Sequence, residues 1–194
     1  MATRPHPQTR SASTGGRKTA VKTPRFTALD GLCMGMRPGA VDPGVILHLF
    51  QTAGLTADQV ETMLYQQSGL LGISGESPDM RVLLESREPA SRQAVDYFVY
   101  RAAREIGGLA AVLGGVEALV FTAGIGERPA VIRRRILAAS AWLGIEVDEA
   151  ANERHGPRIS RATSRVSAWV VATDEEQMIA RHTARLLGIA GRRG

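Results

Sequence analysis

Apolar positions along the 194-residue chain change their spacing several times, and each change marks a predicted element. Residues 90–113 carry apolar side chains at intervals of three and four, which predicts a long helix that Gly114 and Gly115 end. Residues 116–121 and 166–173 are short apolar runs of the kind that forms buried strands. A helix is expected after each strand. The alternation predicts an α/β domain with parallel strands joined by right-handed crossovers.

The residues ahead of the long helix show a weaker pattern. Residues 26–43 are rich in glycine and proline, and we expect a loop with short helical pieces, followed by a short buried helix over residues 45–50. Thr56 and Gln59 have the spacing of a capping box, which predicts the start of another helix. Residues 68–81 are rich in glycine and serine and are expected to form a loop.

Charge is distributed unevenly between the N-terminal stretch and the rest of the chain. Residues 1–25 contain six of the 24 Lys and Arg residues and none of the 19 Asp and Glu residues. With few apolar groups to bury, they are expected to form a basic, disordered tail. Such a tail can bind polyanions weakly through phosphates, but it lacks aromatic residues for stacking on bases. The remaining residues are nearly neutral, so we expect no specific nucleic-acid partner.

Hydropathy and cysteine usage limit the class of protein further. No apolar run approaches the roughly 18 residues of a membrane-spanning helix. The first residues have no apolar stretch of the kind found in a secretory signal peptide. The single cysteine, Cys33, excludes an internal disulfide. We therefore expect a cytoplasmic protein with no membrane partner.

The strongest local motif is FTAGIGE, residues 121–127, where a buried strand passes into a glycine-rich turn and then a helix. Glycine lets the backbone approach a ligand, and the N-terminus of a helix favours anions. The motif is not a dinucleotide fingerprint, since Pro129 stands where a third glycine is expected. From the pattern alone, a nucleotide-binding turn and a purely structural turn are equally good interpretations.

A second motif, Thr173 to Glu176, follows the second predicted strand. Carboxylates at the carboxyl end of a strand lie where open α/β sheets bind ligands, and Mg²⁺ prefers one or two carboxylates with phosphate oxygens. Helix capping is the alternative interpretation. It explains Asp174 and does not exclude a metal role for Glu175. Arg37 is a weaker candidate. It lies in a glycine and proline loop and could bind phosphate, but a surface arginine is the simpler interpretation. The Asp79–Arg81 pair is either a pair of ligands or an ordinary helix start.

Taken together, these segments resemble the signatures of the acetokinase family, within the sugar kinase, Hsp70 and actin superfamily. The resemblance runs from Phe26 to about Leu187, and its segments are FTALDGLCMGMRPGAVDPGVI, SGLLGISGESPDMR, ALVFTAGIGE and ATDEEQMIAR. It implies the α/β, ribonuclease H-like C-terminal domain of acetate kinase over residues 26–190. That domain would be incomplete here, because its first strands would precede Phe26.

The resemblance also implies an activity, a cofactor and site residues. Members transfer a phosphoryl group from ATP to acetate with Mg²⁺, giving ADP and acetyl phosphate, and the same motifs separate propionate and butyrate kinases less well. Arg37 resembles the family's catalytic arginine, which binds the carboxylate and the transferring group, and Glu175 resembles the magnesium ligand. Arg128 stands where the family usually has asparagine. The nucleotide-binding residues would be Asp79, Met80, Arg81, Gly124, Ile125, Gly126, Glu127 and Arg128.

The chain also departs from the family that it resembles. Members are much longer, with two domains and the active site between them, and they dimerise through the C-terminal domain. We therefore expect a C-terminal piece of the enzyme with little activity alone, and a homodimer is a plausible assembly. The alternative is a non-catalytic remnant that binds nucleotide or only dimerises. Residues 1–25 lack the family's histidine-led glycine loop, and a frame shift or an altered start is the expected origin of this difference.

Overall fold

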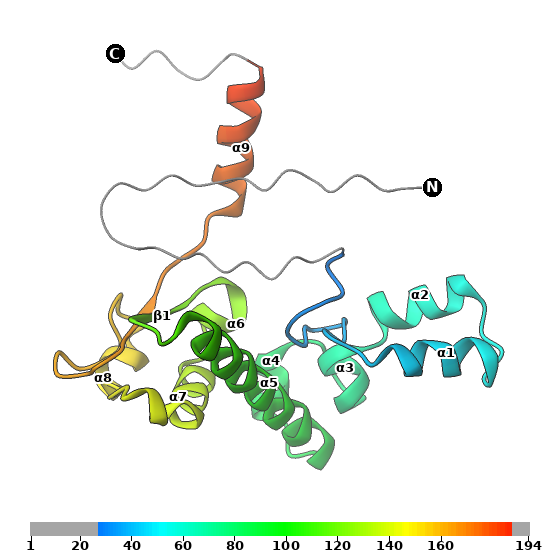
Figure 1. Ribbon diagram of the computed structural model, residues 1–194, viewed down its shortest axis with the longest axis horizontal. Helices are drawn as coiled ribbons and strands as arrows, with labels where there is room; N and C mark the ends of the chain where they lie inside the picture. The colour runs from blue at the N-terminus through cyan, green and yellow to red at the C-terminus, as the bar shows by residue number, and fades with distance from the viewer. Residues whose placement is uncertain (1–26, 188–194) are drawn as a thin grey trace.

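The computed structural model describes residues 27–187, with the backbone alone at Glu175. The tail predicted over residues 1–25 lies outside the described residues. The described elements run in chain order as shown in Figure 1: α1 (Pro43–Gln51), α2 (Ala57–Gln66), α3 (Gly69–Ser74), α4 (Met80–Glu85), α5 (Pro89–Leu113), β1 (Ala118–Phe121), α6 (Ala123–Glu127), α7 (Ala130–Ala139), the 3₁₀-helix η1 (Ala141–Leu143), α8 (Glu149–Glu153), β2 (Ser167–Val170) and α9 (Glu175–Leu186).

The two predicted strands are present and pair in parallel, with Ala118 opposite Ser167 and Phe121 opposite Val170. The prediction that both strands are buried is wrong for β1, whose residues are all half-buried or exposed, because among the described residues only β2 pairs with it. A crossover through α6, α7, η1 and α8 connects them. The predicted mixture of helices and parallel strands is therefore confirmed. Because parallel strands end at the same edge of a sheet, the turns that follow β1 and β2 lie side by side.

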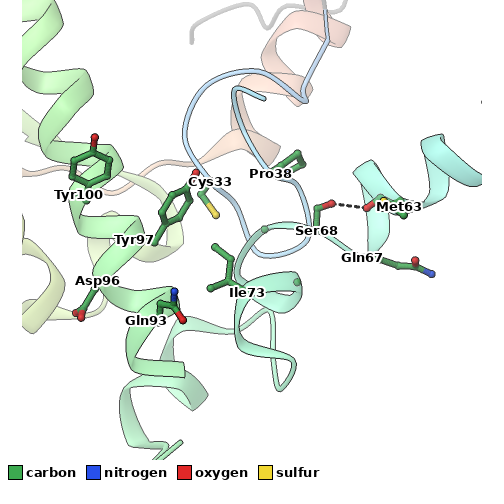
Figure 2. Close-up of a pocket in the computed structure, with 12 residues that line it drawn as sticks. Cys33, Pro38, Met63, Gln67, Ser68, Ile73, Gln93, Asp96, Tyr97 and Tyr100 are labelled. Atoms are coloured by element: carbon green, nitrogen blue, oxygen red, sulfur yellow. Dashed lines mark hydrogen bonds between the residues drawn. The ribbon is translucent and has the colours of Figure 1, made fainter. Parts of the chain in front are cut away.

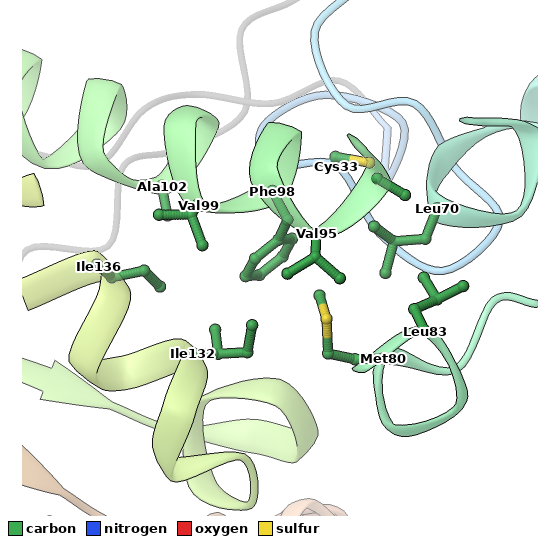
Figure 3. Close-up of a cluster of buried hydrophobic side chains, with 11 residues drawn as sticks. Cys33, Leu70, Met80, Leu83, Val95, Phe98, Val99, Ala102, Ile132 and Ile136 are labelled. Carbon is green, nitrogen blue, oxygen red and sulfur yellow. The ribbon is translucent and has the colours of Figure 1, made fainter. Parts of the chain in front are cut away.

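A cluster of buried apolar side chains joins α5 to three other helices (Figure 3). One face of α5 contributes Ala94, Val95, Phe98, Val99 and Ala102, and this face meets Leu70 of α3, Met80 and Leu83 of α4, and Ile132 and Ile136 of α7. Burial of one such large side chain stabilises the fold by about 1.5–3 kcal/mol. Packing against the common face of α5 holds α4 close to α7. In the sequence the two helices are far apart, because 44 residues lie between Glu85, the last residue of α4, and Ala130, the first residue of α7.

A second buried cluster lies beneath the sheet. Ala168 of β2 is completely buried there, and Leu137 at the end of α7 is 1% exposed. The cluster is completed by Ala110, Leu143, Ile145, Ile159 and Val166. It fixes β2 against the end of α5 and the crossover, so the start of the acidic turn after β2 has a defined position.

Three further predictions about individual elements need correction. The helix predicted over residues 45–50 forms as α1, but it is not buried, since Leu47 is 55% exposed and Phe50 is 41% exposed. The reason is that α1 packs mainly against α2, and the pair lies at one end of the molecule (Figure 1). Residues 68–81, predicted to be a loop, contain α3 and the start of α4. Burial of Leu70, which is 0% exposed, outweighs the turn-forming composition.

The third correction concerns the turn after β1, which is a short helix, α6, and not an open loop. The next helix begins immediately afterwards, with Pro129 at its N-cap position. The prediction for the last helix is confirmed, because Asp174 caps α9 by accepting a hydrogen bond of 2.7 Å from the backbone N–H of Gln177. Figure 1 shows α9 extending away from the other elements, and Ile179 is 65% exposed.

Among residues 27–187, none of the helices combines the length and the apolar character that crossing a bilayer requires.

Candidate functional site

A pocket of about 270 Å³ lies where the start of α4 faces α6. Ligand sites for small molecules usually measure about 300–1,000 Å³, so its size is close to the lower end of that range. The pocket brings together two segments that the sequence motifs singled out separately. It is lined by Pro78, Asp79, Met80, Arg81, Gly124, Ile125, Arg128 and Pro129.

The first wall of the pocket is built around Asp79, the N-cap residue of α4. Its carboxylate accepts a hydrogen bond of 2.9 Å from the backbone N–H of Arg81, and the guanidinium of Arg81 donates to both carboxylate oxygens. The hydrogen bond from the Arg81 side chain is the main reason why the pKa of Asp79 falls to about 2, and the positive charge of Arg128 acts in the same direction. Asp79 is therefore ionised at neutral pH, and both arginines lie close to it.

Met80 occupies a different environment from its two neighbours. Its side chain is 2% exposed and packs in the cluster formed with α5. Because this side chain is fixed in the core, Asp79 and Arg81 are held at the surface on either side of it. The sequence resemblance places all three residues in one nucleotide-binding block, and in the structure Met80 both packs in the core and lines the pocket.

The second wall comes from α6 and the residue after it. An added Cβ at Gly124 would meet no atom within 4 Å, so this position is open towards the pocket. Gly126 differs, because its Cβ would lie 3.3 Å from the carbonyl carbon of Phe121. Ile125 is half-buried and packs against the core formed by α5 and α7. The absence of a side chain thus matters differently at the two glycines. At Gly124 it leaves the pocket open, and at Gly126 it allows close packing on β1.

Glu127 links the turn after β1 to the turn after β2 by hydrogen bonds. Its Oε1 atom accepts hydrogen bonds from the backbone N–H of Ala123, at 2.7 Å, and from the N–H and O–H of Thr173, both at 2.9 Å. These hydrogen bonds, above all those from Thr173, hold the pKa of the Glu127 carboxyl below its usual value. The contact places the acidic turn beside α6, an anchoring role that the sequence motif did not predict.

The acidic turn is the place where the sequence predicts a metal ligand. Asp174 is engaged in capping α9, and the next residue, Glu175, begins that helix. The position of the Glu175 side chain lies outside the described structure, and Glu176 is exposed. Within the described residues, no group of three or more His, Cys, Asp or Glu side chains has the arrangement of a metal site. The donor chemistry of this turn suits Mg²⁺, which needs few protein carboxylates when phosphate oxygens complete its shell.

Arg37 lies in a loop that packs beside the start of α4 but does not line the pocket. Its guanidinium carbon is 5.9 Å from the centre of the Tyr65 ring, within the range of a cation–π interaction. The loop is close to the pocket because Gly35 packs on Pro78, where a Cβ would come within 2.9 Å of the Pro78 carbonyl oxygen. The structure therefore brings the loop of Arg37, and not its side chain, to the edge of the site.

Arg133 is a site residue that the sequence analysis missed. It is completely buried, and it donates hydrogen bonds to the carbonyl oxygens of Gly126, at 3.0 Å, and Glu127, at 2.6 Å. The same guanidinium binds Asn152 and Nδ1 of His155. Since a guanidinium can only donate, Nδ1 of His155 is the acceptor. Arg133 thus holds the end of α6 in place from behind the pocket.

A larger cavity of about 930 Å³ lies elsewhere, between α5, α3 and the loop that precedes α1 (Figure 2). Tyr97, Tyr100 and Ile73 line it together with Cys33. Burial raises the pKa of the Cys33 thiol to about 11, so the thiol is protonated at neutral pH and is not an activated nucleophile. Of the site residues expected from the sequence whose side chains the structure describes, none lines this cavity.

Comparison with known proteins places these features in a family. The family model described as the acetokinase family matches residues 11–181, and the chain belongs to this family. The match begins ahead of Phe26, so the resemblance extends further towards the N-terminus than the motifs alone indicated. The acetate kinase of Rhodopseudomonas palustris (strain TIE-1) is 54% identical over 171 residues, which make up 87% of this chain and 43% of that protein. The acetate kinase of Nitrobacter hamburgensis is 51% identical over 89% of this chain and 43% of its own length.

Solved structures agree with this assignment. The acetate kinase of Porphyromonas gingivalis superposes with a TM-score of 0.74 and 38% identity over 82% of this chain and 41% of that one. A propionate kinase from Francisella tularensis gives a TM-score of 0.73 and 36% identity over 79% of this chain and 40% of that one. The predicted fold class, a partial acetate kinase fold, is therefore confirmed. The chain spans less than half the length of the relatives that it matches.

Proposed function

We propose that this chain carries the nucleotide-binding part of an acetate kinase and binds ADP or ATP in the pocket between α4 and α6. The main support is the convergence of two separate motifs, at residues 79–81 and 124–128, on one pocket. Its walls combine apolar groups, such as Ile125 and Pro129, with the guanidinium groups of Arg81 and Arg128. Apolar walls suit a nucleobase, and guanidinium groups suit phosphate or ribose oxygens.

The proposed reaction is phosphoryl transfer from ATP to acetate. A carboxylate oxygen of acetate attacks the γ-phosphorus, the bond from that phosphorus to the bridging oxygen breaks, and ADP leaves with the bridging oxygen and its electrons. Catalysis of this kind depends on positioning and on neutralising charge. In this proposal Arg37 binds the carboxylate and the transferring group. Glu175 would be the protein ligand of Mg²⁺ bound with ATP, and the metal would supply neutralisation of phosphate charge.

Gly124→Val is expected to weaken ADP binding by at least about tenfold, ~1.4 kcal/mol, without disturbing the fold. The reason is that an added side chain at Gly124 meets no protein atom within 4 Å but projects into the pocket. Isothermal titration calorimetry of the full chain with ADP measures the effect, and the far-UV circular dichroism spectrum checks the fold.

Gly108→Val provides the matched control for this experiment. Gly108 is also exposed, its Cβ would also meet nothing within 4 Å, and it lies on α5 away from the pocket. The control is expected to bind ADP as the unmodified chain does. Equal affinities in the two variants would count against this pocket, and an unmodified chain without measurable affinity for ADP would count against nucleotide binding as a whole.

We further expect the chain by itself to make little or no acetyl phosphate. Its relatives are more than twice as long, and the family resemblance implies an active site between two domains. Correct orientation of reactants can lower a barrier by roughly 7–11 kcal/mol, which part of a site does not provide. A hydroxamate assay with ATP, Mg²⁺ and acetate measures the product. Turnover of about 1–10³ s⁻¹, the usual range for enzymes, would show that this expectation is wrong.

A further inference from the structure

Two arginine side chains line the pocket between α4 and α6, and they differ in their hydrogen bonds. The guanidinium of Arg81 donates through its Nε and Nη2 atoms to the carboxylate of Asp79. The guanidinium of Arg128 forms no ion pair with the residues that the structure describes, and the side chain is exposed. Arg128 is therefore the arginine whose donors are available to a ligand in this pocket.

The position of the pocket indicates which part of a nucleotide would face Arg128. In the proposed function, the transferring phosphate lies with Arg37 and with the acidic turn that begins at Thr173. The structure describes both of these residues, and neither lines the pocket. The volume of about 270 Å³ is also small for a ligand site. The pocket therefore suits the nucleoside end of the nucleotide, with the phosphates extending out of it.

A guanidinium can distinguish one purine from another because all of its polar atoms are donors. Guanine presents two neighbouring acceptors, O6 and N7, and an arginine that donates to both is the commonest specific contact with this base. Adenine presents the N7 acceptor beside the N6 amino group, which is itself a donor. An arginine placed at this edge would therefore have both donors paired against guanine, and one donor opposed by another against adenine.

We propose that Arg128 donates to O6 and N7 of a 6-oxopurine base, so that this chain binds guanine nucleotides more tightly than adenine nucleotides. Ile125 and Pro129 line the same pocket and offer apolar surface to the base. Arg128 stands where the family usually has asparagine, so the preference is expected of this chain in particular. The inference rests on the proposed function, because it names the base of the nucleotide that the pocket is proposed to bind.

Isothermal titration calorimetry of the full chain with ADP, GDP and IDP measures the preference. We expect GDP to bind at least about fivefold more tightly than ADP, the lower end of the discrimination that a bidentate contact provides. IDP is expected to bind as GDP does, because hypoxanthine has the same O6 and N7 acceptors and lacks only the 2-amino group. The three ligands share their ribose and phosphates, so a difference in affinity arises at the base.

Arg128→Asn tests whether this residue causes the preference. Asparagine has both a donor and an acceptor and pairs with N6 and N7 of adenine, so the variant is expected to bind ADP at least as tightly as GDP. Arg134→Asn is the matched control, because Arg134 is 48% exposed on α7 and does not line the pocket. It loses the same charge and is expected to retain the preference for GDP. Circular dichroism checks that both variants fold.

The possible outcomes separate this inference from the proposed function. Equal or tighter binding of ADP by the unmodified chain would overturn the inference and leave the proposed function intact. Loss of affinity for ADP and GDP by the same factor in Arg128→Asn would also overturn it, because that result indicates contact with ribose or phosphate, or stacking on either base. A preference for GDP that Arg134→Asn abolishes as well would overturn it too. A chain that binds none of the three nucleotides would refute both.

Discussion

Arg133→Met is expected to lower the free energy of unfolding by about 3 kcal/mol, because it leaves several buried acceptors without a donor. Arg133 is 0% exposed. Its Nε and Nη2 atoms each donate to Asn152 at 2.8 Å, and its Nη1 atom donates to the carbonyl groups of Gly126 and Glu127. Burial lowers the pKa of the guanidinium, but an arginine remains charged in proteins. Methionine retains much of the length of the side chain and removes the donors and the charge.

The neighbouring Arg134 supplies the control for this measurement. Its side chain is 48% exposed, and its only ion pair among the described residues is a distant one of 4.0 Å with Glu149. Arg134→Met is therefore expected to change the free energy of unfolding by no more than about 0.5 kcal/mol. Urea denaturation followed by circular dichroism measures both variants. Similar midpoints for the two would show that the buried hydrogen bonds of Arg133 contribute little.

The elements with regular apolar spacing could be predicted from the sequence. The spacing of apolar residues in α5 reflects the face that it buries, and the short apolar runs of β1 and β2 reflect their packing against the second buried cluster. The short helices were harder to predict from the sequence. The helix α3 lies in a stretch rich in glycine and serine, and it forms because Leu70 is buried against α5. Such packing between distant segments has no counterpart in local composition.

In the candidate site, likewise, some features could be predicted from the sequence and others could not. Its two nucleotide-binding segments could be named from their motifs, but their meeting at one pocket depends on how α4 and α7 pack against α5. The role of Arg133 was not predicted, because Arg133 stands in a run of three arginines, of which it alone is buried. A signal was nevertheless present. Arg133 stands three and four residues before the buried Ile136 and Leu137, on the apolar face of α7, where an arginine needs buried partners.

Gly69→Ala is expected to lower the free energy of unfolding by about 3–4 kcal/mol, by strain and by steric overlap together. Gly69 has a φ of +66°, in the left-handed region. A Cβ there would lie 2.2 Å from the carbonyl oxygen of Met34 and 2.7 Å from that of Arg37. The backbone N–H of Leu70 donates to the Met34 carbonyl at 2.9 Å, so the loop cannot move away without losing this hydrogen bond. The substitution should therefore displace the loop that carries Arg37.

Gly75→Ala separates the two causes, because Gly75 has nearly the same φ, +65°, but an added Cβ would meet nothing within 4 Å. Left-handed backbone alone costs an alanine about 1–2 kcal/mol, and that is the expected effect at Gly75. The difference between the variants, about 2 kcal/mol, then measures the overlap with the Arg37 loop. Urea unfolding at equal m-value provides both free energies. Equal destabilisation by the two substitutions would mean that the loop can move aside freely, and that α3 does not fix the position of Arg37.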